Sequence, residues 1–179
     1  MRVRTAAWSP RWAAGALVAA VLLAGCSDPD EPGTVPRTTP TVATSTPSPT
    51  PTTVEAQIEA MMLAYFTASN EMFETGQVSQ VRAFSSDGCP CRKISNDVQK
   101  VVSAGGRYEG TSYEVTSVNV HDVAGATAAA EVKADVSPYK VIDGSGKTIE
   151  DSPGGQLHTD YSLVHQGNRW IIVNAVNLG

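Results

Sequence analysis

A tract rich in proline and threonine confines folding to the C-terminal part of this chain. Residues Ser27 to Thr53 contain seven prolines, nine threonines and no aromatic side chain. Because almost nothing in this tract is apolar, burial cannot offset the conformational entropy that ordering it would cost. Proline-rich spacers favour extended polyproline geometry instead. We therefore expect a linker over residues 26–53 and one folded domain over residues 54–179.

The segment before the linker is organised as an export signal. Arg2, Arg4 and Arg11 form a basic leader, and the apolar stretch Ala13 to Ala24 follows it. This stretch is shorter than the ~20 residues with which a helix spans a bilayer. Residues 1–25 are therefore expected to be a cleaved signal peptide and not a membrane anchor.

The signal ends in Leu23-Ala24-Gly25-Cys26, which resembles the lipobox of bacterial lipoproteins. The resemblance implies cleavage before Cys26 and a diacylglyceryl thioether on its sulfur. Each buried methylene contributes about 0.8 kcal/mol, so two acyl chains on one residue would hold the protein durably to the extracytoplasmic face of the cell membrane. The alternative is an ordinary secretory peptide that ends beside a cysteine by chance.

The charge of the domain excludes two classes of partner. From Val54 onward the chain carries nine Lys or Arg and fifteen Asp or Glu residues, a net charge of −6. Nucleic-acid binding needs a basic stripe, and adhesion to anionic lipid headgroups needs basic clusters. The lipid on Cys26 is thus the expected link to the membrane, and no nucleic-acid partner is expected.

Apolar residues recur every three or four positions in the first part of the domain, which predicts three helices. Thr52 and Glu55 have the spacing of a capping box, and Gly76 supplies a stop. A short second helix follows, and a third runs from about Arg92 to Gly105-Gly106. The side chains expected to face the core are Ile58, Met61, Met62, Tyr65, Ser69, Met72 and Phe73, then Val78, Val81 and Phe84, then Ile94, Val98, Val101 and Val102.

After Gly106 the apolar residues alternate with a period of two, which predicts strands. The first is expected from Tyr108 to Val120 with a bulge near Ser117. The next has one apolar face, made of Ala128, Ala130, Val132, Ala134 and Val136. Two hairpins are expected after it, one through Val141–Ile149 and one from Leu157–His165 to Arg169–Asn177 through the turn Gly167-Asn168.

Helices followed by a meander of antiparallel strands give the element order of an α+β domain. The order also resembles the nuclear transport factor 2-like cone, in which three helices pack into the concave face of a curved sheet. The resemblance covers Val54 to Gly179 and includes the last hairpin with Trp170. The lipobox, the linker, the closely spaced cysteines and the Gly-Gly helix end are together similar to a group of uncharacterised actinobacterial lipoproteins.

The motif Cys89-Pro90-Cys91 has three interpretations. If Cys26 is lipidated, an even pair remains in an exported, oxidising setting, where disulfides persist. The pair is then a structural disulfide before the third helix, a redox-active pair at a helix N-terminus, or two thiols that are free or paired between chains. The usual redox motif has two intervening residues, so the structural disulfide is favoured. A zinc site lacks further ligands, and no metal is expected.

Three residues are candidates for a pocket. Tyr65 brings a hydroxyl onto the apolar face of the first helix, although it also suits a core position. Ala130 belongs to a row of inward alanines that leaves room for either a ligand or a closely packed helix. Trp170 stands in the last strand, whose two faces are equally apolar, so its concave side is undetermined.

The histidines are expected at the surface. His158 and Asp160 have the opposite parity to the apolar residues of their strand, so they point to solvent. His121 and His165 lie beside turns. No catalytic residue or cofactor is assigned, because the sequence has no nucleophile, phosphate-loop or metal-ligand motif.

These observations favour a lipid-anchored, non-catalytic domain that binds a small apolar ligand or an envelope protein. The resemblance to the cone fold supplies the main alternative, since relatives such as ketosteroid isomerase and scytalone dehydratase carry out acid/base chemistry in the cone. Such an enzyme would use Tyr65 with a carboxylate that the sequence does not identify. A thiol-redox accessory using Cys89 and Cys91 is the third hypothesis.

Overall fold

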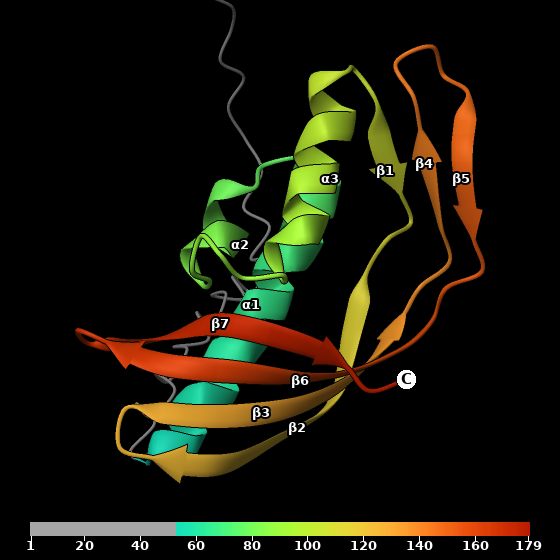
Figure 1. Ribbon diagram of the computed structural model, residues 1–179. Helices are drawn as coiled ribbons and strands as arrows, with labels where there is room; N and C mark the ends of the chain where they lie inside the picture. The colour runs from blue at the N-terminus through green and yellow to red at the C-terminus, as the bar shows by residue number, and fades with distance from the viewer. Residues whose placement is uncertain (1–52) are drawn as a thin grey trace, which may run out of the picture. The chain divides into compact units, whose positions relative to one another are not determined.

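The computed structural model describes residues 53–179 (Figure 1). The predicted signal peptide, Cys26 and all but the last residue of the linker lie outside the described residues. The helices are α1 (Val54–Thr75), α2 (Ser79–Ala83) and α3 (Arg92–Ser103). The strands are β1 (Arg107–Glu109), β2 (Tyr113–Ala124), β3 (Thr127–Val136), β4 (Tyr139–Ile142), β5 (Thr148–Ser152), β6 (Gly155–Gln166) and β7 (Arg169–Asn177). None of the described helices has the length and apolar character that crossing a membrane requires.

Helix α1 is capped at both ends. Thr53 is the N-cap, and its side chain accepts a hydrogen bond of 3.2 Å from the Ala56 N–H. The cap predicted at Thr52 is therefore one residue too early, because Thr53 holds the extended backbone that precedes the helix. At the other end Gly76 adopts the left-handed conformation (φ 73°), as predicted, and donates to the Met72 carbonyl at 2.8 Å. Both bonds satisfy backbone groups that a helix end leaves unpaired.

Helix α3 buries only part of its predicted apolar face. Val98 is fully buried, whereas Ile94 and Val101 are half-buried and Val102 is 38% exposed. The prediction of a core position is wrong for Val102. This residue lies beside Gly76 at the end of α1, where the packed helix pair ends. Ile94 and Val101 border open cavities instead of packed neighbours.

The strands form two antiparallel sheets. Strands β2, β3, β6 and β7 are adjacent in this order, and β1, β4 and β5 form the second sheet. In Figure 1 the four-stranded sheet lies across α1, and the three-stranded sheet stands beside α3. The architecture is α+β, as the order of elements predicts.

The predicted single strand from Tyr108 to Val120 is two strands in different sheets. Gly110 separates them with a φ of 84°, and a Cβ atom there would lie only 2.8 Å from the Pro138 carbonyl oxygen. Both the positive φ and the close approach require glycine. The alternation of apolar side chains continues across this break, so the sequence pattern does not indicate that the chain passes to another sheet here. The predicted bulge is confirmed, because the register of β2 against β3 shifts between Val115 and Ser117.

The main core lies between α1 and the four-stranded sheet. The alternation predicted for β3 is confirmed, since Ala128, Ala130, Val132 and Ala134 are all buried. Because alanine adds little bulk to the sheet surface, the side chains of α1 pack directly against it. The largest fully buried side chains are Ile58, Met62, Met72, Leu163, Ile172, Val98, Val132 and Ser95.

Strand β7 changes face at a bulge. Its register with β6 shifts so that Val173 has no partner. Before the bulge Ile172 lies opposite Leu163, and after it Ala175 lies opposite Tyr161. The inward-facing positions therefore skip one residue, which explains why both parities of this strand are apolar in the sequence.

We expect Gly154→Ala to destabilise the domain much more than Gly146→Ala. Both glycines have a left-handed backbone, with φ of 79° and 87°, so alanine at either position costs roughly 1–2 kcal/mol. Only at Gly154 would the new Cβ atom clash, at 2.3 Å from the Val136 carbonyl oxygen. This crowding should lower the free energy of unfolding of the Gly154→Ala variant by a further amount of about 1–3 kcal/mol. The free energy of unfolding is measured by urea denaturation. Equal losses in the two variants would contradict the close approach at this junction of the sheets.

Candidate functional site

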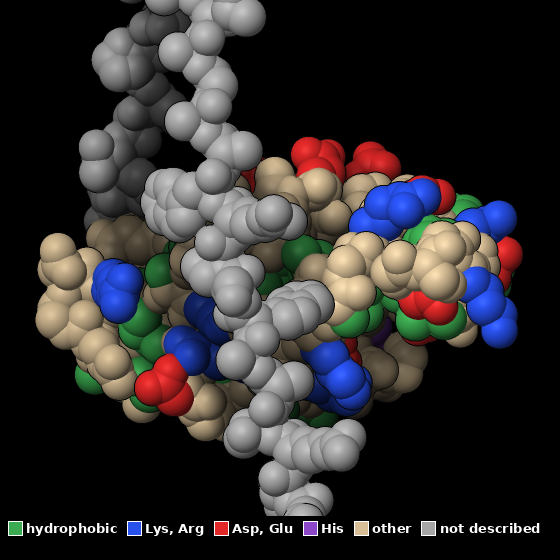
Figure 2. All heavy atoms as spheres, turned by 90° about the horizontal axis from the view of Figure 1, so that it is seen from above, with side chains coloured by type: hydrophobic (Ala, Val, Ile, Leu, Met, Phe, Trp, Pro, Cys, Tyr) green, Lys and Arg blue, Asp and Glu red, His purple; other side chains and the backbone are tan. Residues whose placement is uncertain are grey.

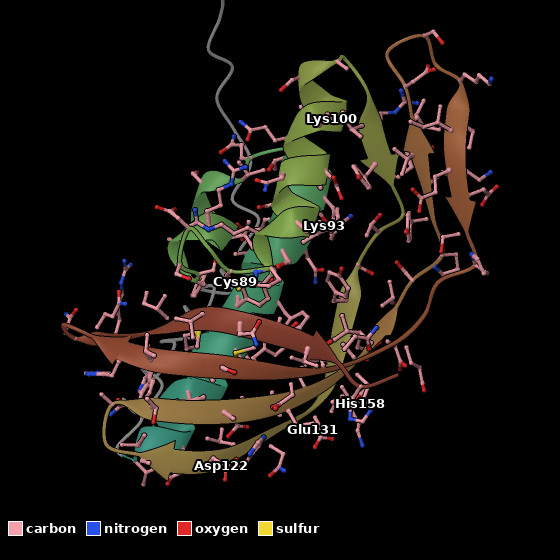
Figure 3. The ribbon with its side chains drawn as sticks, in the orientation of Figure 1. Cys89, Lys93, Lys100, Asp122, Glu131 and His158 are labelled. Carbon is pink, nitrogen blue, oxygen red and sulfur yellow. A yellow bond between two sulfur atoms is a disulfide. The ribbon has the colours of Figure 1, made fainter. Side chains whose placement is uncertain are left out.

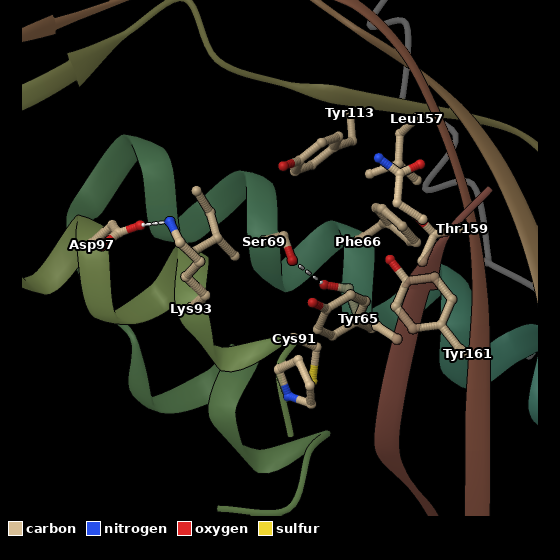
Figure 4. Close-up of a pocket in the computed structure, with 14 residues that line it drawn as sticks. Tyr65, Phe66, Ser69, Cys91, Lys93, Asp97, Tyr113, Leu157, Thr159 and Tyr161 are labelled. Carbon is tan, nitrogen blue, oxygen red and sulfur yellow. Dashed lines mark hydrogen bonds and ion pairs between the residues drawn. The ribbon is translucent and has the colours of Figure 1, made fainter. Parts of the chain in front are cut away.

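A cavity of about 460 Å³ opens between α1, the start of α3 and the ends of β6 and β7 (Figure 4). We call it the tyrosine cavity after three of its lining residues. Its walls combine aromatic and aliphatic side chains with a few hydroxyl groups. The lining includes Tyr65, Phe66, Ser69, Tyr113, Thr159 and Tyr161. Small-molecule sites are typically of about 300–1,000 Å³ and have this kind of lining.

Three tyrosines from three elements meet in this cavity. Tyr65 comes from the middle of α1, Tyr113 from the start of β2 and Tyr161 from β6. The ring centroids of Tyr65 and Tyr161 are 6.1 Å apart. Phe66 braces the group, with its centroid 5.4 Å from Tyr113 and 6.3 Å from Tyr161. These edge-to-face contacts hold the rings in place, and Figure 4 shows the three hydroxyl groups directed toward the cavity.

The hydroxyl groups of the tyrosines are neutral over the physiological range. Burial raises the pKa of Tyr65 from 10.0 to about 12, and it raises the pKa of Tyr113 to about 12. Burial also raises the pKa of Tyr161, and the neighbouring Tyr65 adds to this effect. A neutral phenol donates one hydrogen bond and accepts others. The cavity therefore presents hydrogen-bond donors and no formal charge at this end.

Local sequence spacing explains part of this geometry. Tyr65 and Ser69 are four residues apart, so they share one face of α1. The Ser69 hydroxyl donates to the Tyr65 carbonyl at 2.8 Å and is thereby satisfied within its own helix. In β6, Thr159 and Tyr161 have the same inward parity and are both buried.

The segment Cys89-Pro90-Cys91 forms the wall at the start of α3. The two sulfur atoms lie at bonding distance, 2.05 Å, so the pair can close this loop as a disulfide. Cys89 is buried in the core, whereas Pro90 and Cys91 line the tyrosine cavity. Arg92, which follows this segment, connects it to Ser85, because the Arg92 Nε donates a hydrogen bond of 3.1 Å to the Ser85 hydroxyl. The wall is thus tied to the residues that precede it.

The rim of the cavity carries one ion pair. Lys93 Nζ and Asp97 Oδ2 are 2.7 Å apart on successive turns of α3. The hydrogen bond that Lys93 donates to the Asp97 carboxylate raises the pKa of Lys93. No histidine lines this cavity. Within residues 53–179, no group of three or more His, Cys, Asp or Glu side chains is placed to hold a metal ion.

A second cavity of about 560 Å³ continues along α3. It lies between α3 and the three-stranded sheet, and we call it the hairpin cavity after the β4–β5 hairpin. Its apolar walls include Phe73, Val101, Tyr108, Val141 and Ile149. Lys93, Ile94, Asp97 and Tyr113 line both cavities. The two spaces are therefore adjoining.

The structure distributes the three candidate pocket residues between the cavity and the core. Tyr65 lines the tyrosine cavity. Ala130 is fully buried in the core that contains the side chains of α1. The space over the alanine row is thus filled by a helix and not by a ligand. Trp170 is also buried, with its ring centroid 5.1 Å from that of His165, so it belongs to the core as well.

The remaining histidines and their acidic partners lie on the other face of the four-stranded sheet, as parity predicts. His158 Nε2 is 2.8 Å from Glu131 Oε1, and His121 Nε2 is 3.0 Å from Asp160 Oδ1. Hydrogen bonds to Asp122 and then Asp160 raise the pKa of His121. Figure 3 shows His158 and Glu131 beside β3 and β6, separate from Lys93 on α3. These pairs are surface features and do not contribute to either cavity.

Two members of the tyrosine group have no candidate role in the sequence analysis. The inward parity of Tyr161 is visible in the sequence, because Leu157 and Leu163 share it. Its contact with Tyr65 depends on how α1 crosses the sheet. The local sequence pattern does not indicate this crossing. Tyr113 was expected only in the middle of a longer strand, and its position at the cavity follows from the break at Gly110.

Solved structures with a similar fold share little sequence with this chain. The intermembrane space region of the chloroplast protein ARC6 has a TM-score of 0.54 at 14% identity, covering 72% of this chain and 99% of that one. A protein with a cystatin-like fold from Caulobacter vibrioides has a TM-score of 0.45 at 16% identity, covering 68% and 85%. An NTF2-like protein of unknown function from Shewanella baltica has a TM-score of 0.41 at 13% identity, covering 71% and 96%. The likeness to the ARC6 region shows that the two share an α+β fold.

The sequence of this chain matches a family model. A family model described as a family of unknown function, DUF6318, matches residues 38–176. No curated protein matches the chain. Since a fold of this kind hosts many functions, the role has to be argued from the chemistry of the site.

The stability of the domain should fall as the pH rises from 10 to 12. The pKa of Tyr65 is about 12 in the folded protein against an ordinary value of 10.0. A raised folded pKa contributes stability that is complete below the unfolded pKa and is lost as the pH rises through the folded value. Tyr65→Phe should therefore weaken the pH dependence of the free energy of unfolding in this window. The ionisation of the tyrosine side chains can be followed directly by the absorbance of the phenolate.

The matched control is Tyr139→Phe. The Tyr139 hydroxyl is outside the tyrosine cavity and donates to Glu150 at 2.8 Å. Its removal should change the pH dependence less than Tyr65→Phe does. An unchanged slope in the Tyr65→Phe protein would contradict the burial of this hydroxyl.

Proposed function

Because this chain belongs to DUF6318, a family of unknown function, we propose its role from the site itself: it binds a small, largely apolar molecule in the tyrosine cavity. The observation that carries the proposal is the meeting of three neutral tyrosine hydroxyls inside a largely apolar space of about 460 Å³. Apolar walls favour an apolar ligand by about 25 cal/mol for each Å² that leaves water. The hydroxyls orient it through a hydrogen-bond acceptor, such as a carbonyl oxygen.

The lining favours binding over catalysis. A general acid or base works best with a pKa near the operating pH, and the pKa values of Tyr65 and Tyr113 are about 12. The carboxylate of this lining, Asp97, is engaged by Lys93 at 2.7 Å on the rim. An isomerase- or dehydratase-like reaction would need that carboxylate free and close to Tyr65. The enzymatic alternative is therefore the weaker one.

We also propose that this domain works outside the cytoplasmic membrane, attached through a lipid on Cys26. The support is in the sequence, where a basic leader, an apolar stretch and the lipobox-like residues precede the linker, as in the actinobacterial lipoproteins that the chain resembles. At about 3.1 Å per residue in polyproline geometry, the linker of 27 residues reaches on the order of 80 Å. At the outer face of the membrane, the alternative to a small apolar ligand is a protein of the cell envelope that binds to the same domain.

Cys26→Ser should move the protein from the membrane fraction to the soluble fraction. The serine hydroxyl cannot form the thioether, so the two acyl chains are lost. Mass spectrometry of the N-terminal peptide of the unaltered protein should show a diacylglyceryl group on Cys26. The control is Cys89→Ser with Cys91→Ser, which should stay in the membrane fraction. An unmodified Cys26 thiol at the mature N-terminus would contradict the anchor.

Benzophenone should label the tyrosine cavity when the full-length protein is irradiated in phosphatidylcholine nanodiscs. This probe is apolar, carries one carbonyl acceptor and inserts into neighbouring C–H bonds. Adducts are expected on the peptides that contain Tyr65 and Tyr161, mapped by mass spectrometry. Each hydrogen bond lost costs about 1 kcal/mol, so the double change Tyr65→Phe with Tyr161→Phe should reduce the labelling affinity at least tenfold.

The control for this experiment is Thr67→Val, which removes an exposed hydroxyl that lies outside both cavities and bonds the Leu63 carbonyl. Its labelling should equal that of the unaltered protein. Adducts spread evenly over the domain, or a double variant that labels normally, would overturn the proposed site.

A further inference from the structure

The tyrosine cavity and the hairpin cavity form one trough along α3. Four residues line both spaces, among them Ile94 from α3 and Tyr113 from β2. The tyrosine cavity measures about 460 Å³ and the hairpin cavity about 560 Å³. Either volume alone suffices for a small ligand, and the two together approach the upper end of ligand sites.

The helices set the length of this trough. On α1 the lining runs from Tyr65 through Ser69 to Phe73, a rise of about 12 Å at ~1.5 Å per residue. Along α3 it runs from the N-cap Cys91 to the C-cap Ala104, a rise of about 20 Å. The trough is therefore elongated, which suits an extended chain better than a compact ring system.

We propose that the ligand is a long-chain, uncharged amphiphile of the monoacylglycerol type. Its ester and hydroxyl oxygens bond the tyrosine hydroxyls, and its chain passes between Ile94 and Tyr113 into the hairpin cavity. There it contacts the apolar walls Phe73, Val101, Val141 and Ile149. This inference rests on the proposed function and specifies the class of ligand for the same site.

The charges near the trough favour an uncharged head. The tyrosine end offers hydroxyl donors, and the cation closest to it, Lys93, is already paired with Asp97 at 2.7 Å. A carboxylate head would enter this end without a counter-ion, which is costly away from water. The domain carries a net charge of −6, which further opposes an anion. Basic and acidic side chains are interspersed on the face shown in Figure 2, so neither sign dominates there.

The hairpin cavity also has charged lining residues, of which Lys100 and Glu150 are exposed and Asp143 is half-buried. Lys100 projects from α3 (Figure 3), and Asp143 and Glu150 come from the β4–β5 hairpin. Asp143 accepts bonds from the Ser145 and Lys147 amides, and Glu150 accepts from the Tyr139 hydroxyl. These carboxylates are occupied within their own hairpin, which leaves the apolar walls for the chain.

The test uses monoacylglycerols with a photoreactive diazirine at the end of the chain. Octanoyl, dodecanoyl and hexadecanoyl forms are irradiated with the full-length protein in phosphatidylcholine nanodiscs, and the adducts are mapped. The octanoyl form should label peptides of the tyrosine cavity, and the hexadecanoyl form should label the end of α3 or the β4–β5 hairpin. Affinity should rise about fourfold for each further methylene that is buried. The fatty acids of the same lengths should label less.

Two neighbouring substitutions provide a matched comparison. Ala104 and Ser103 are both exposed at the end of α3, but only Ala104 lines the hairpin cavity. Ala104→Trp should abolish hexadecanoyl labelling beyond the junction and leave octanoyl labelling unchanged, whereas Ser103→Trp should alter neither. Ile149→Trp obstructs the same cavity from the opposite wall and should repeat the result of Ala104→Trp.

Each result bears on one of the two proposals. If benzophenone labels the tyrosine cavity but the diazirine adducts stay there at every chain length, the long-chain ligand is overturned and the proposed binding function stands. Equal labelling by acids and esters overturns the uncharged head. If neither probe labels the cavity, the proposed function itself is overturned.

Discussion

The contact between α1 and the inner face of the four-stranded sheet is the interaction on which the rest of this structure depends. The side chains of α1 share one core with the buried alanines of β3, and Ile58, Met62 and Met72 are fully excluded from water. Toward the other edge of this contact the sheet carries Tyr161 in place of alanine, and the helix carries Tyr65. Their rings are in edge-to-face contact, with centroids 6.1 Å apart, and both line the tyrosine cavity.

The periodic parts of the fold are predictable because their causes are local. The apolar stripe of α1, the stop at Gly76, the alternation of β3 and the hairpin at Gly167-Asn168 all follow from neighbours in the sequence. The errors arise where a distant contact decides. The chain passes from one sheet to the other at Gly110, where the backbone of Pro138 lies against it. Val102 is exposed because it lies beside Gly76, where α1 ends.

The site was predictable only in part, for the same reason. Tyr65 was identifiable because a hydroxyl on an apolar stripe is unusual, and the parity of Tyr161 was correct. That the two rings meet is a tertiary fact, fixed by the crossing of α1 over β6. Ala130 and Trp170 were plausible lining residues by composition, yet both are buried in the core that contains the side chains of α1. Sequence thus indicates which side chains face inward, but not where the interior remains empty.

The cysteine loop at the start of α3 has a consequence for when the site becomes complete. Pro90 and Cys91 form one wall of the tyrosine cavity, and their loop is closed by the bond that Cys89 and Cys91 can make. A newly made chain in a reducing compartment holds both cysteines as thiols, and disulfides persist only under oxidising conditions. The shape of this wall is thereby coupled to the redox history of the polypeptide, because the loop closes only after Cys89 and Cys91 are oxidised.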